Sequence, residues 1–568
     1  MKRVILSVLV LLLYTATANA QAAKITWGEE FKGTKESYNV MLIYADNTCS
    51  FVKESHDVDN PAFEKNHVSK ESITLMKFDA SMQKLFEKSY DKELENKLYV
   101  TFFFLNGKAF LLASVYDKNT FISTLLAVEI DKNSGELIGD WATLDTQTKD
   151  SKLGSVYYKA MYNHDSTKMV LASALFGVEE SKYQIRLFGD KLMPLNQPII
   201  SIKDFHPRTF VLESLIYTTE GNVVLMGRQY KYQDGKRQID DNLELDNYVI
   251  RIYSANGTII KNINADSNAK WVVSAKIQQM PNKDLIFAAF YGDKTEPQQI
   301  KGLLIQRINP VTGEIITTHE KILHSYKRKI SDGKNYVDKR TKEEKELEKK
   351  LKREWETYSK DMGIRYFIPT TDNGVVILAE KEYNFKFYSS YTSSGSNIAY
   401  SYGLQRYEYG DILMIKVNAV DSIDWMRLLP KDQQENGFST DRRSFFGSYV
   451  SKGFFETGSN EPLYSGFGVL VSPAAIHIFF NDNGSNKDVL KIEQSVAKDN
   501  DRLASHCFVM KLDPITGEYM RSSLFKNRHV PTAMPRLGLA VDKTFHLLGY
   551  ELKLLGKTKL VLAKINID

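Results

Sequence analysis

Short apolar and polar runs alternate along the chain, and one pattern of run and turn recurs. Its clearest copy, His506-Cys-Phe-Val-Met-Lys-Leu-Asp-Pro-Ile-Thr-Gly-Glu-Tyr519, has an apolar run, a basic residue, an apolar residue and Asp before a Gly-bearing turn. Apolar and aromatic residues suit a strand, whereas Asp, Asn and Gly suit tight turns, so each copy predicts two strands joined by a turn. The other copies lie at 125–137 and 303–315 and, more loosely, around 77–79, 186–188, 251–253, 416–418 and 564–566.

Upstream of each copy, a polar turn precedes another apolar run, as in Asp372-Asn-Gly-Val-Val-Ile-Leu-Ala379. With the extended run before it, each unit reads as four strands in two hairpins, which is the signature of a β-propeller. We therefore predict an all-β fold, a single β-propeller of four-stranded antiparallel blades. Eight blades are predicted, with seven as the alternative because Phe188 and Tyr253 replace the Asp or Asn of the pattern. The predicted units are 35–90, 97–145, 156–203, 209–264, 272–322, 363–430, 447–526 and 536–568.

Both ends of the chain carry further signals. Two basic residues precede an apolar run, Val4 to Tyr14, and small residues stand before Gln21. This pattern is typical of a secretory signal peptide, and the run is shorter than the roughly 20 residues of a membrane span. We expect cleavage after Ala20, so that residues 1–20 are the signal peptide and 21–568 the propeller, located in the periplasm or secreted, without a membrane span.

The last unit stops after its third strand. The stretch Ile25-Thr-Trp-Gly-Glu-Glu-Phe31 resembles a fourth strand. Pairing of this N-terminal strand with the last unit would close the ring and leave no open sheet edge there.

The long connections are expected on one face. A unit averages about 69 residues, against roughly 40 to 50 in compact propeller repeats. Turns within hairpins are short, so the excess lies between second and third strands or between blades, and these connections emerge on the same face. Binding residues concentrate in such loops, although neutral insertion is the alternative. The long segments are 54–71, 228–246, 323–362, 384–410, 431–462 and 481–504.

Three of the connecting segments have a distinct character. Within the insertion 323–362, residues 341–360 predict a charged helix with one narrow apolar stripe, lying on the rim or docking a partner. The Tyr/Ser-rich insertion 384–410 suits an adaptable recognition loop or an extended hairpin. The link 527–536 is stiffened by Pro and could direct two basic residues toward the central opening. The candidate partner-binding residues are Tyr388, Tyr391, Tyr400, Tyr402, Arg406, Tyr407, Arg442, Arg443, His529 and Arg536.

Composition and motifs narrow the chemistry. The formal charge of +5 becomes +3 without Lys2 and Arg3, which argues against a nucleic-acid partner. Cys49 and Cys507 are expected as buried free thiols, with one disulfide as the alternative. No metal-ligand or nucleophile motif occurs, so no catalytic residue, metal ligand or cofactor is assigned. Calcium stays open, because 240–246 and 481–486 cluster oxygen ligands without EF-hand spacing.

The units resemble bacterial β-propeller repeats in which an apolar run, Lys, an apolar residue, Asp and a Gly turn precede a strand with Trp, as in Lys416-Val-Asn418 with Trp425. The chain, from Thr26-Trp-Gly-Glu-Glu30 to Ala533-Met-Pro-Arg-Leu-Gly538, resembles exported bacterial propeller proteins of unassigned activity. The resemblance implies the fold and carries no activity, since propellers host enzymes and binding scaffolds alike.

The function expected from these observations is binding. We predict an exported, monomeric scaffold that recognises a protein or a glycan through the long connections of one face. The missing catalytic motifs favour a protein that is not an enzyme. The alternative is a hydrolase or lyase acting on polysaccharide or peptide, with carboxylates or His from several blades converging at the mouth of the central channel.

Overall fold

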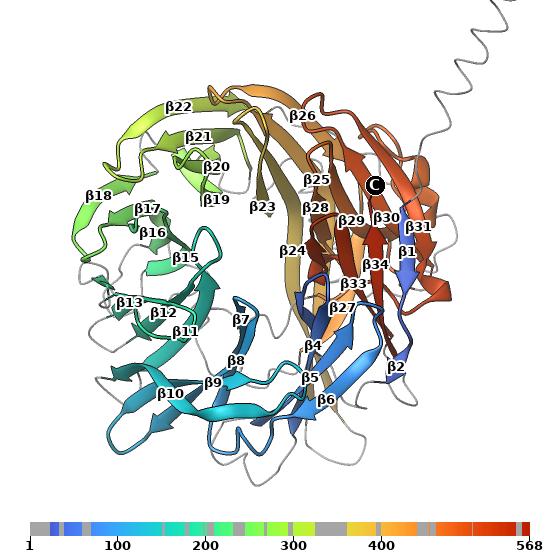
Figure 1. Cartoon of the computed structure of the whole chain (residues 1–568). Helices are drawn as coiled ribbons and strands as arrows, with labels where there is room; N and C mark the ends of the chain where they lie inside the picture. The colour runs from blue at the N-terminus through green and yellow to red at the C-terminus, as the bar shows by residue number, and fades with distance from the viewer. Residues whose placement is uncertain are drawn as a thin grey trace, which may run out of the picture.

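The computed structural model describes residues 23–32, 39–58, 70–149, 154–176, 181–196, 199–201, 210–230, 245–265, 270–293, 299–323, 361–392, 399–439, 454, 462–502, 504–551 and 559–567. These residues form eight antiparallel sheets, each with a four-stranded path, arranged as blades around a common centre (Figure 1). The prediction of eight blades is confirmed, and the alternative of seven is wrong.

Blades 1 to 4 follow one another along the chain. Blade 1 comprises β3 (Asn39–Ala45), β4 (Cys49–Val58), β5 (Lys70–Asp79) and β6 (Lys84–Ser89). Blade 2 comprises β7 (Leu98–Leu105), β8 (Lys108–Asp117), β9 (Ile122–Ile130) and β10 (Leu137–Thr148). Blade 3 comprises β11 (Ser155–Tyr162), β12 (Met169–Phe176), β13 (Ser181–Phe188) and β14 (Ile199–Ser201). Blade 4 comprises β15 (Phe210–Tyr217), β16 (Val223–Tyr230), β17 (Leu245–Tyr253) and β18 (Ile259–Asn264).

Blades 5 to 8 complete the ring. Blade 5 comprises β19 (Lys270–Gln279), β20 (Leu285–Asp293), β21 (Gly302–Ile308) and β22 (Ile315–Ile322). Blade 6 comprises β23 (Met362–Pro369), β24 (Val375–Thr392), β25 (Ala399–Val417), β26 (Ile423–Leu429) and the additional β27 (Gln433–Ser439). Blade 7 comprises β28 (Phe467–Val471), β29 (Ile476–Asn483), β30 (Ser505–Leu512) and β31 (Tyr519–Lys526). Blade 8 comprises β32 (Leu539–Val541), β33 (Thr544–Glu551), β34 (Lys559–Asn566), β1 (Lys24–Trp27) and β2 (Phe31–Lys32).

The N-terminal strand belongs to the last blade, as the sequence predicts. β1 pairs with β34 from Lys24↔Asn566 to Trp27↔Ala563, and β2 continues along the same strand. Blade 8 then contacts blade 1 directly, since Lys564 Nζ donates to the backbone oxygen of Ala80 at 2.7 Å. The N-terminal strands therefore complete the last blade, and this blade contacts the first through side chains.

Eight hydrophobic clusters hold the described part of the ring together, one at each junction between neighbouring blades. The cluster between blades 8 and 1 packs Leu548 and Leu562 against Val52 and Met76. Cys49 and Cys507 are buried free thiols in different junctions, which confirms the prediction. The core thus lies between the blades, because each sheet buries both faces against its neighbours.

The repeated turn also joins blades. In blade 5 the side-chain oxygen of Asn309 accepts the backbone N–H groups of Val311 and Thr312 at 2.8 and 3.1 Å. Gly313 has φ +69°, and a Cβ on it would lie 2.3 Å from Cβ of Lys261 in blade 4. Only Gly combines that backbone angle with so close an approach. The repeated Asn or Asp therefore shapes the turn, and the repeated Gly lets the preceding blade dock.

In these antiparallel blades the turns between first and second strands and between third and fourth strands lie at one end of each sheet, and the second and third strands are joined at the other end. Most of the long segments 54–71, 228–246 and 323–362 lie outside the described residues. The only helices among the described residues are three 3-10 turns, η4 (Gly484–Asp488), η5 (Asn527–His529) and η6 (Pro535–Leu537). The predicted charged helix 341–360 and the signal peptide 1–20 lie outside the described residues, so both stay predictions. In the part of the chain described here, no helix has the length and apolarity of a membrane span.

Candidate functional site

Blade 6 extends beyond the ring, and its long strands cross much of the view in Figure 1. β24 and β25 have 18 and 19 residues, whereas β20 and β21 of blade 5 have 9 and 7. Beyond a bulge after Glu380, their pairing continues from Glu382↔Tyr409 to Thr392↔Ala399, roughly 35 Å at the usual rise per residue. β27 adds a third strand, from Tyr409↔Gln433 to Gly403↔Ser439. Residues 382–392, 399–409 and β27 are called the blade 6 extension below.

The blade 6 extension covers most of the described part of the Tyr/Ser-rich segment 384–410. The sequence left an adaptable loop and an extended hairpin open, and the backbone forms the hairpin. Aromatic residues are frequent in this segment and favour strands, which pair them across the hairpin. The register places Tyr391 opposite Tyr400, Ser389 opposite Tyr402 and Tyr388 opposite Gly403.

Buried ion pairs anchor the base of the extension. Lys431 Nζ lies 2.6 Å from Glu380 Oε1, and the two side chains are 0% and 1% exposed. Arg365 of the innermost strand β23 lies 3.7 Å from Glu380 and also pairs with Glu382. The Tyr409 hydroxyl donates to Glu382 at 2.9 Å. Because a lone buried charge is strongly unfavourable, these partners fix one another in position.

β27 connects the extension to blade 7 through two polar side chains. The Glu435 carboxylate accepts the backbone N–H groups of Leu463, Tyr464 and Ser465, each at 2.9 Å. Gln433 accepts the N–H of Gly466 at 3.0 Å, and its Nε2 donates to the backbone oxygen of Asn481 at 2.6 Å. Residues 463–466, which lead into β28 and are called the approach to blade 7 below, are therefore held against β27.

A buried amide network continues from blade 7 to blade 8. Asn481 Nδ2 donates to the backbone oxygens of Tyr464 and Ala533 at 3.0 and 2.8 Å. Asn527 Nδ2 donates to Asn481 Oδ1 at 3.0 Å and to Ser505 Oγ at 2.7 Å. Blades 6, 7 and 8 thus share one chain of buried hydrogen bonds, which lies at the end of the sheets where second and third strands are joined.

The acidic residue of the calcium candidate 481–486 is used within this region. Asp482 lies 2.6 Å from Arg521, both side chains being 0% exposed, and it accepts from Asn486 Nδ2 at 2.9 Å. Among the residues that the structure describes, no group of three or more His, Cys, Asp or Glu side chains is arranged to hold a metal ion. Most of the second candidate, 240–246, lies outside the described residues.

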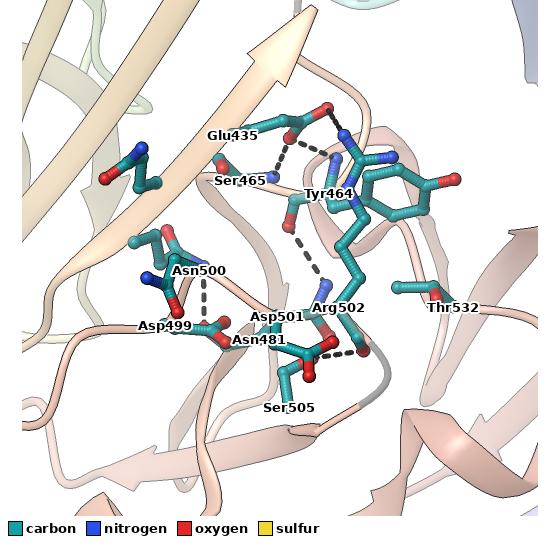
Figure 2. A pocket seen from close by; sticks show the side chains of 12 residues that line it. Glu435, Tyr464, Ser465, Asn481, Asp499, Asn500, Asp501, Arg502, Ser505 and Thr532 are labelled. Atoms are coloured by element: carbon teal, nitrogen blue, oxygen red, sulfur yellow. Dashed lines mark hydrogen bonds and ion pairs between the residues drawn. The ribbon is translucent and has the colours of Figure 1, made fainter. Parts of the chain in front are cut away.

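A polar pocket lies where these elements meet (Figure 2). Its cavity volume is about 10 Å³, room for about one water-sized group. It is called the acidic pocket because three carboxylates line it against one cation, Arg502. The lining residues are Gln433, Gln434, Glu435, Tyr464, Ser465, Asn481, Asp499, Asn500, Asp501, Arg502, Ser505 and Thr532.

Asp499 is a buried acidic residue of the acidic pocket. Its residue is 9% exposed, and its carboxyl makes no hydrogen bond or ion pair within the described part of the chain. Burial and, next, the charge of Asp482 raise the pKa of Asp499 well above its usual value, while Lys431 opposes this shift. Arg502, the cation of the pocket, does have partners. It lies 4.3 Å from the centre of the Tyr464 ring and donates to the Asn436 backbone oxygen at 3.1 Å.

The residues predicted from the sequence fall into separate groups. Arg406 and Tyr407 lie at the base of the extension, where Arg406 is 2.8 Å from Glu408 and Tyr407 is buried. The four other tyrosines lie further along the hairpin. Arg442 and Arg443 are outside the described residues.

The two candidates of the link to blade 8 do not join this group. His529 is exposed on η5. Arg536 packs against Gly466 and donates to the Pro462 backbone oxygen at 2.5 Å. Arg536 thus fixes the approach to blade 7.

Sequence reasoning missed the acidic pocket. β27, Gln-Gln-Glu-Asn-Gly-Phe-Ser, has almost no apolar residues and carries no strand pattern. Its partners, Tyr464, Asn481 and Asp499, are far from it in the sequence. The only available signal was the cluster of acidic residues at 499–501, which equally fits a solvated turn.

Phe454 makes a contact between blades that are distant in the chain. Phe454 belongs to the connection between blades 6 and 7, yet it packs against the cluster between blades 3 and 4. Lys159 of the innermost strand β11 donates to its backbone oxygen at 2.5 Å and lies 4.3 Å from its ring centre. Phe454 therefore lies against blades 3 and 4.

A second hollow, of about 270 Å³, lies between the short turns of blades 6 and 7 on the opposite face. Its walls are apolar, with hydroxyl groups as the polar exception, and no titratable side chain lines it. Its polar groups are the hydroxyls of Thr370, Thr371 and Ser472. Its residues are Ile368, Pro369, Thr370, Thr371, Val471, Ser472, Pro473, Ile476 and Pro514.

Eight four-stranded blades define the class of the protein as a β-propeller, here with one extended blade and a polar pocket at its base. No family model matches the sequence, and no curated protein matches it. Solved structures with a similar fold include the α-L-arabinanase of Penicillium chrysogenum, with 9% identity, 63% of this chain and 93% of that chain covered, and TM-score 0.31. The β-propeller domain of the Trilobed protease from Pyrococcus furiosus, with open velcro topology, has 9% identity, coverage of 73% and 98%, and TM-score 0.28. Drosophila Plexin A in complex with Semaphorin 1b has 8% identity, coverage of 72% and 81%, and TM-score 0.27.

These similarities concern the fold alone. A propeller is compatible with binding and with hydrolysis, and the choice between them depends on the site.

Proposed function

We propose that this protein is an exported binding protein that recognises a partner protein or a glycan through the blade 6 extension. The main support is the buried ion pair of Lys431 and Glu380 at the base of the extension. Desolvating two charges costs several kcal/mol per ion before they pair. An insertion at a tolerant surface site needs no such anchor.

The composition of the hairpin supports recognition. By register, Tyr391, Tyr400 and Tyr402 occupy positions on one face of the hairpin, because residues of opposite pairs share a face. Tyr gives a large contact area at low conformational entropy cost, which suits binding surfaces. A rigid base and a Tyr-rich end together favour a preorganised binding element. Export rests on the signal peptide predicted at residues 1–20.

Site-specific photo-crosslinking tests this function. A benzoylphenylalanine introduced at Tyr391 should give one adduct of defined mass in cells that make the protein. The matched control replaces Ile138, which is 49% exposed on blade 2, and should give none. Equal adduct patterns at both positions would contradict the proposal.

A shortened hairpin provides the second half of the test. Residues 387–404 are replaced by Asn-Gly, which joins the paired residues Lys386 and Gln405 by a two-residue turn. Most of the pairing with β27 is kept, so thermal stability should change by no more than about 1 kcal/mol, as for surface changes. The partner identified by crosslinking is then captured with the wild-type and the shortened chain, neither carrying the photo-crosslinker, and its recovery by the shortened chain should fall at least tenfold.

The alternative is hydrolysis at the acidic pocket, which is lined by three carboxylates. A cavity of about 10 Å³ has no room for a sugar ring or a peptide unit. Hydrolysis of a polysaccharide or peptide substrate by the wild type, lost in Asp499→Asn, would support this alternative over binding.

A further inference from the structure

We infer that the acidic pocket binds one primary ammonium group, such as the end of a lysine side chain or of a small free amine. A lysine ligand would come from a partner protein, so that part of the inference rests on the proposed function. The ammonium site itself does not.

Charge and size select this ligand. Glu435, Asp499 and Asp501 face Arg502, so the lining is net negative. The cavity takes a group of about the size of water, which fits an ammonium and excludes a planar guanidinium. A multivalent metal ion is disfavoured, because no described group of acidic side chains is arranged around such an ion.

The partners of each lining group indicate where the ammonium would lie. Glu435 is occupied by three backbone N–H groups, and Asn481 by backbone oxygens and Asn527. Asp499 remains, a carboxyl nine-tenths buried that borders the cavity and has no hydrogen bond within the described residues. The hydroxyls of Ser465 and Thr532 line the same cavity. An ammonium has three donors, so it can satisfy Asp499 and nearby hydroxyl oxygens together.

The pH dependence follows from the same group. Burial is the largest cause of the raised pKa of Asp499, followed by the charge of Asp482. The carboxylates of Asp432 and Asp501 act in the same direction, Lys431 opposes them, and Arg502 lines the same pocket. Asp499 therefore has a raised pKa in the empty pocket and must ionise to pair with a cation. Affinity should rise with pH, by up to tenfold per unit, until Asp499 is ionised in the free protein.

Isothermal titration calorimetry of the full chain with methylammonium chloride at pH 8 tests the site. Titrations with sodium chloride and tetramethylammonium chloride at equal ionic strength serve as size controls on the wild type. The expected result is saturable heat with about one site per chain for methylammonium only. Absence of saturable heat, or equal binding of tetramethylammonium, would overturn the inference and leave a pocket for one water.

Two matched variants locate the site. Asp499→Asn keeps the shape and removes the charge, and it should weaken methylammonium binding at least tenfold. Asp488→Asn changes a carboxylate in the same connection that is 85% exposed, and it should bind as the wild type does. Equal loss in both variants would show a diffuse charge effect and contradict the assignment to the pocket.

Two further probes distinguish a lysine of a partner protein from a small free amine as the ligand. N-acetyl-lysine methylamide should bind if a lysine of a partner is the ligand, and its ε-acetylated form should not. Binding of methylammonium without the lysine probe assigns the pocket to small free amines. It would leave the proposed function to the crosslinking test, so the two proposals can fail separately.

Discussion

Blades 5 and 6 are neighbours built from the same unit, yet one ends at the ring and the other continues past it. In each, the second strand starts opposite the last residue of the third, at Leu285↔Ile308 and Val375↔Val417. Five residues along the second strand from these pairs, blade 5 has the buried Phe290 where blade 6 has the buried Glu380. The same sheet position therefore holds an aromatic ring in one blade and half of an ion pair in the other.

The ends of the two sheets explain the difference. Blade 5 ends beside Lys301 and Asp293, 3.4 Å apart and 43% and 45% exposed, where water solvates both charges. In blade 6, β27 and the approach to blade 7 cover the corresponding end, so water is excluded. A charge there needs a buried partner, and Lys431 supplies it. Buried charge thus marks the place where the fold adds a further strand, β27, to the sheet.

Breaking the blade 6 ion pair should have the largest effect. Lys431→Met leaves Glu380 buried with only the more distant Arg365, and we expect a loss of about 3–5 kcal/mol in the free energy of unfolding. Denaturant unfolding of the full chain measures it. The double variant Lys431→Met with Glu380→Leu places apolar side chains at this position of blade 6, as Phe290 does in blade 5. It should recover most of the lost free energy of unfolding. A single variant within 1 kcal/mol of the wild type would refute the role of the pair.

The turns of the two blades offer a smaller contrast. The left-handed position is Gly313 in blade 5 and Asp421 in blade 6, with φ +69° and +65°. Asp421 accepts Arg307 Nη2 of blade 5 at 2.6 Å, and both side chains are buried. Asp421→Gly relieves the backbone but strips this guanidinium of a partner, so a net loss of about 2 kcal/mol is expected.

The control for this change is Asp421→Asn, because Asn tolerates the left-handed region and keeps a hydrogen-bonding oxygen. It should lose about half as much stability as Asp421→Gly in the same denaturant experiment. If Asp421→Gly proved as stable as the wild type, the contact with Arg307 would contribute nothing to the junction of blades 5 and 6.

The sequence reveals features whose causes are local. The unit boundaries could be predicted because the Asn or Asp and the Gly of each turn act within a few residues, as at Asn309 and Gly313. The blade 6 extension was only half predicted, since Tyr and Ser fit a loop as well as a hairpin. The acidic pocket could not be predicted, because Glu435 and Asp499 gain their roles from chain segments far away in the sequence. Ion pairing and burial are properties of the assembled ring.

Blades 7 and 8 show another way to bury a titratable group, which is to keep it uncharged. Burial and, to a lesser extent, Lys511 lower the pKa of His477 to about 4, and burial with Lys564 does the same for His546. In the unfolded chain, His477 and His546 take up a proton near pH 6.5, whereas in the folded chain they do so only near pH 4. Stability should therefore be full above pH 6.5 and fall as the pH drops toward 4, by about 2 kcal/mol for each His.

Replacing one of these His residues should flatten the pH dependence of the folding stability. At neutral pH it should change the stability less than the Lys431 and Asp421 variants do. His546→Gln removes one titrating group while keeping a polar side chain near Ser50 Oγ, which lies 3.4 Å from His546 Nδ1. Melting temperatures at pH 7, 5.5 and 4.5 measure the slope. His164→Gln, on an exposed turn of blade 3, is the control and should leave the slope of the wild type unchanged. Equal slopes in all three proteins would mean that His546 is already charged in the fold, which would place it with the paired groups of blade 6.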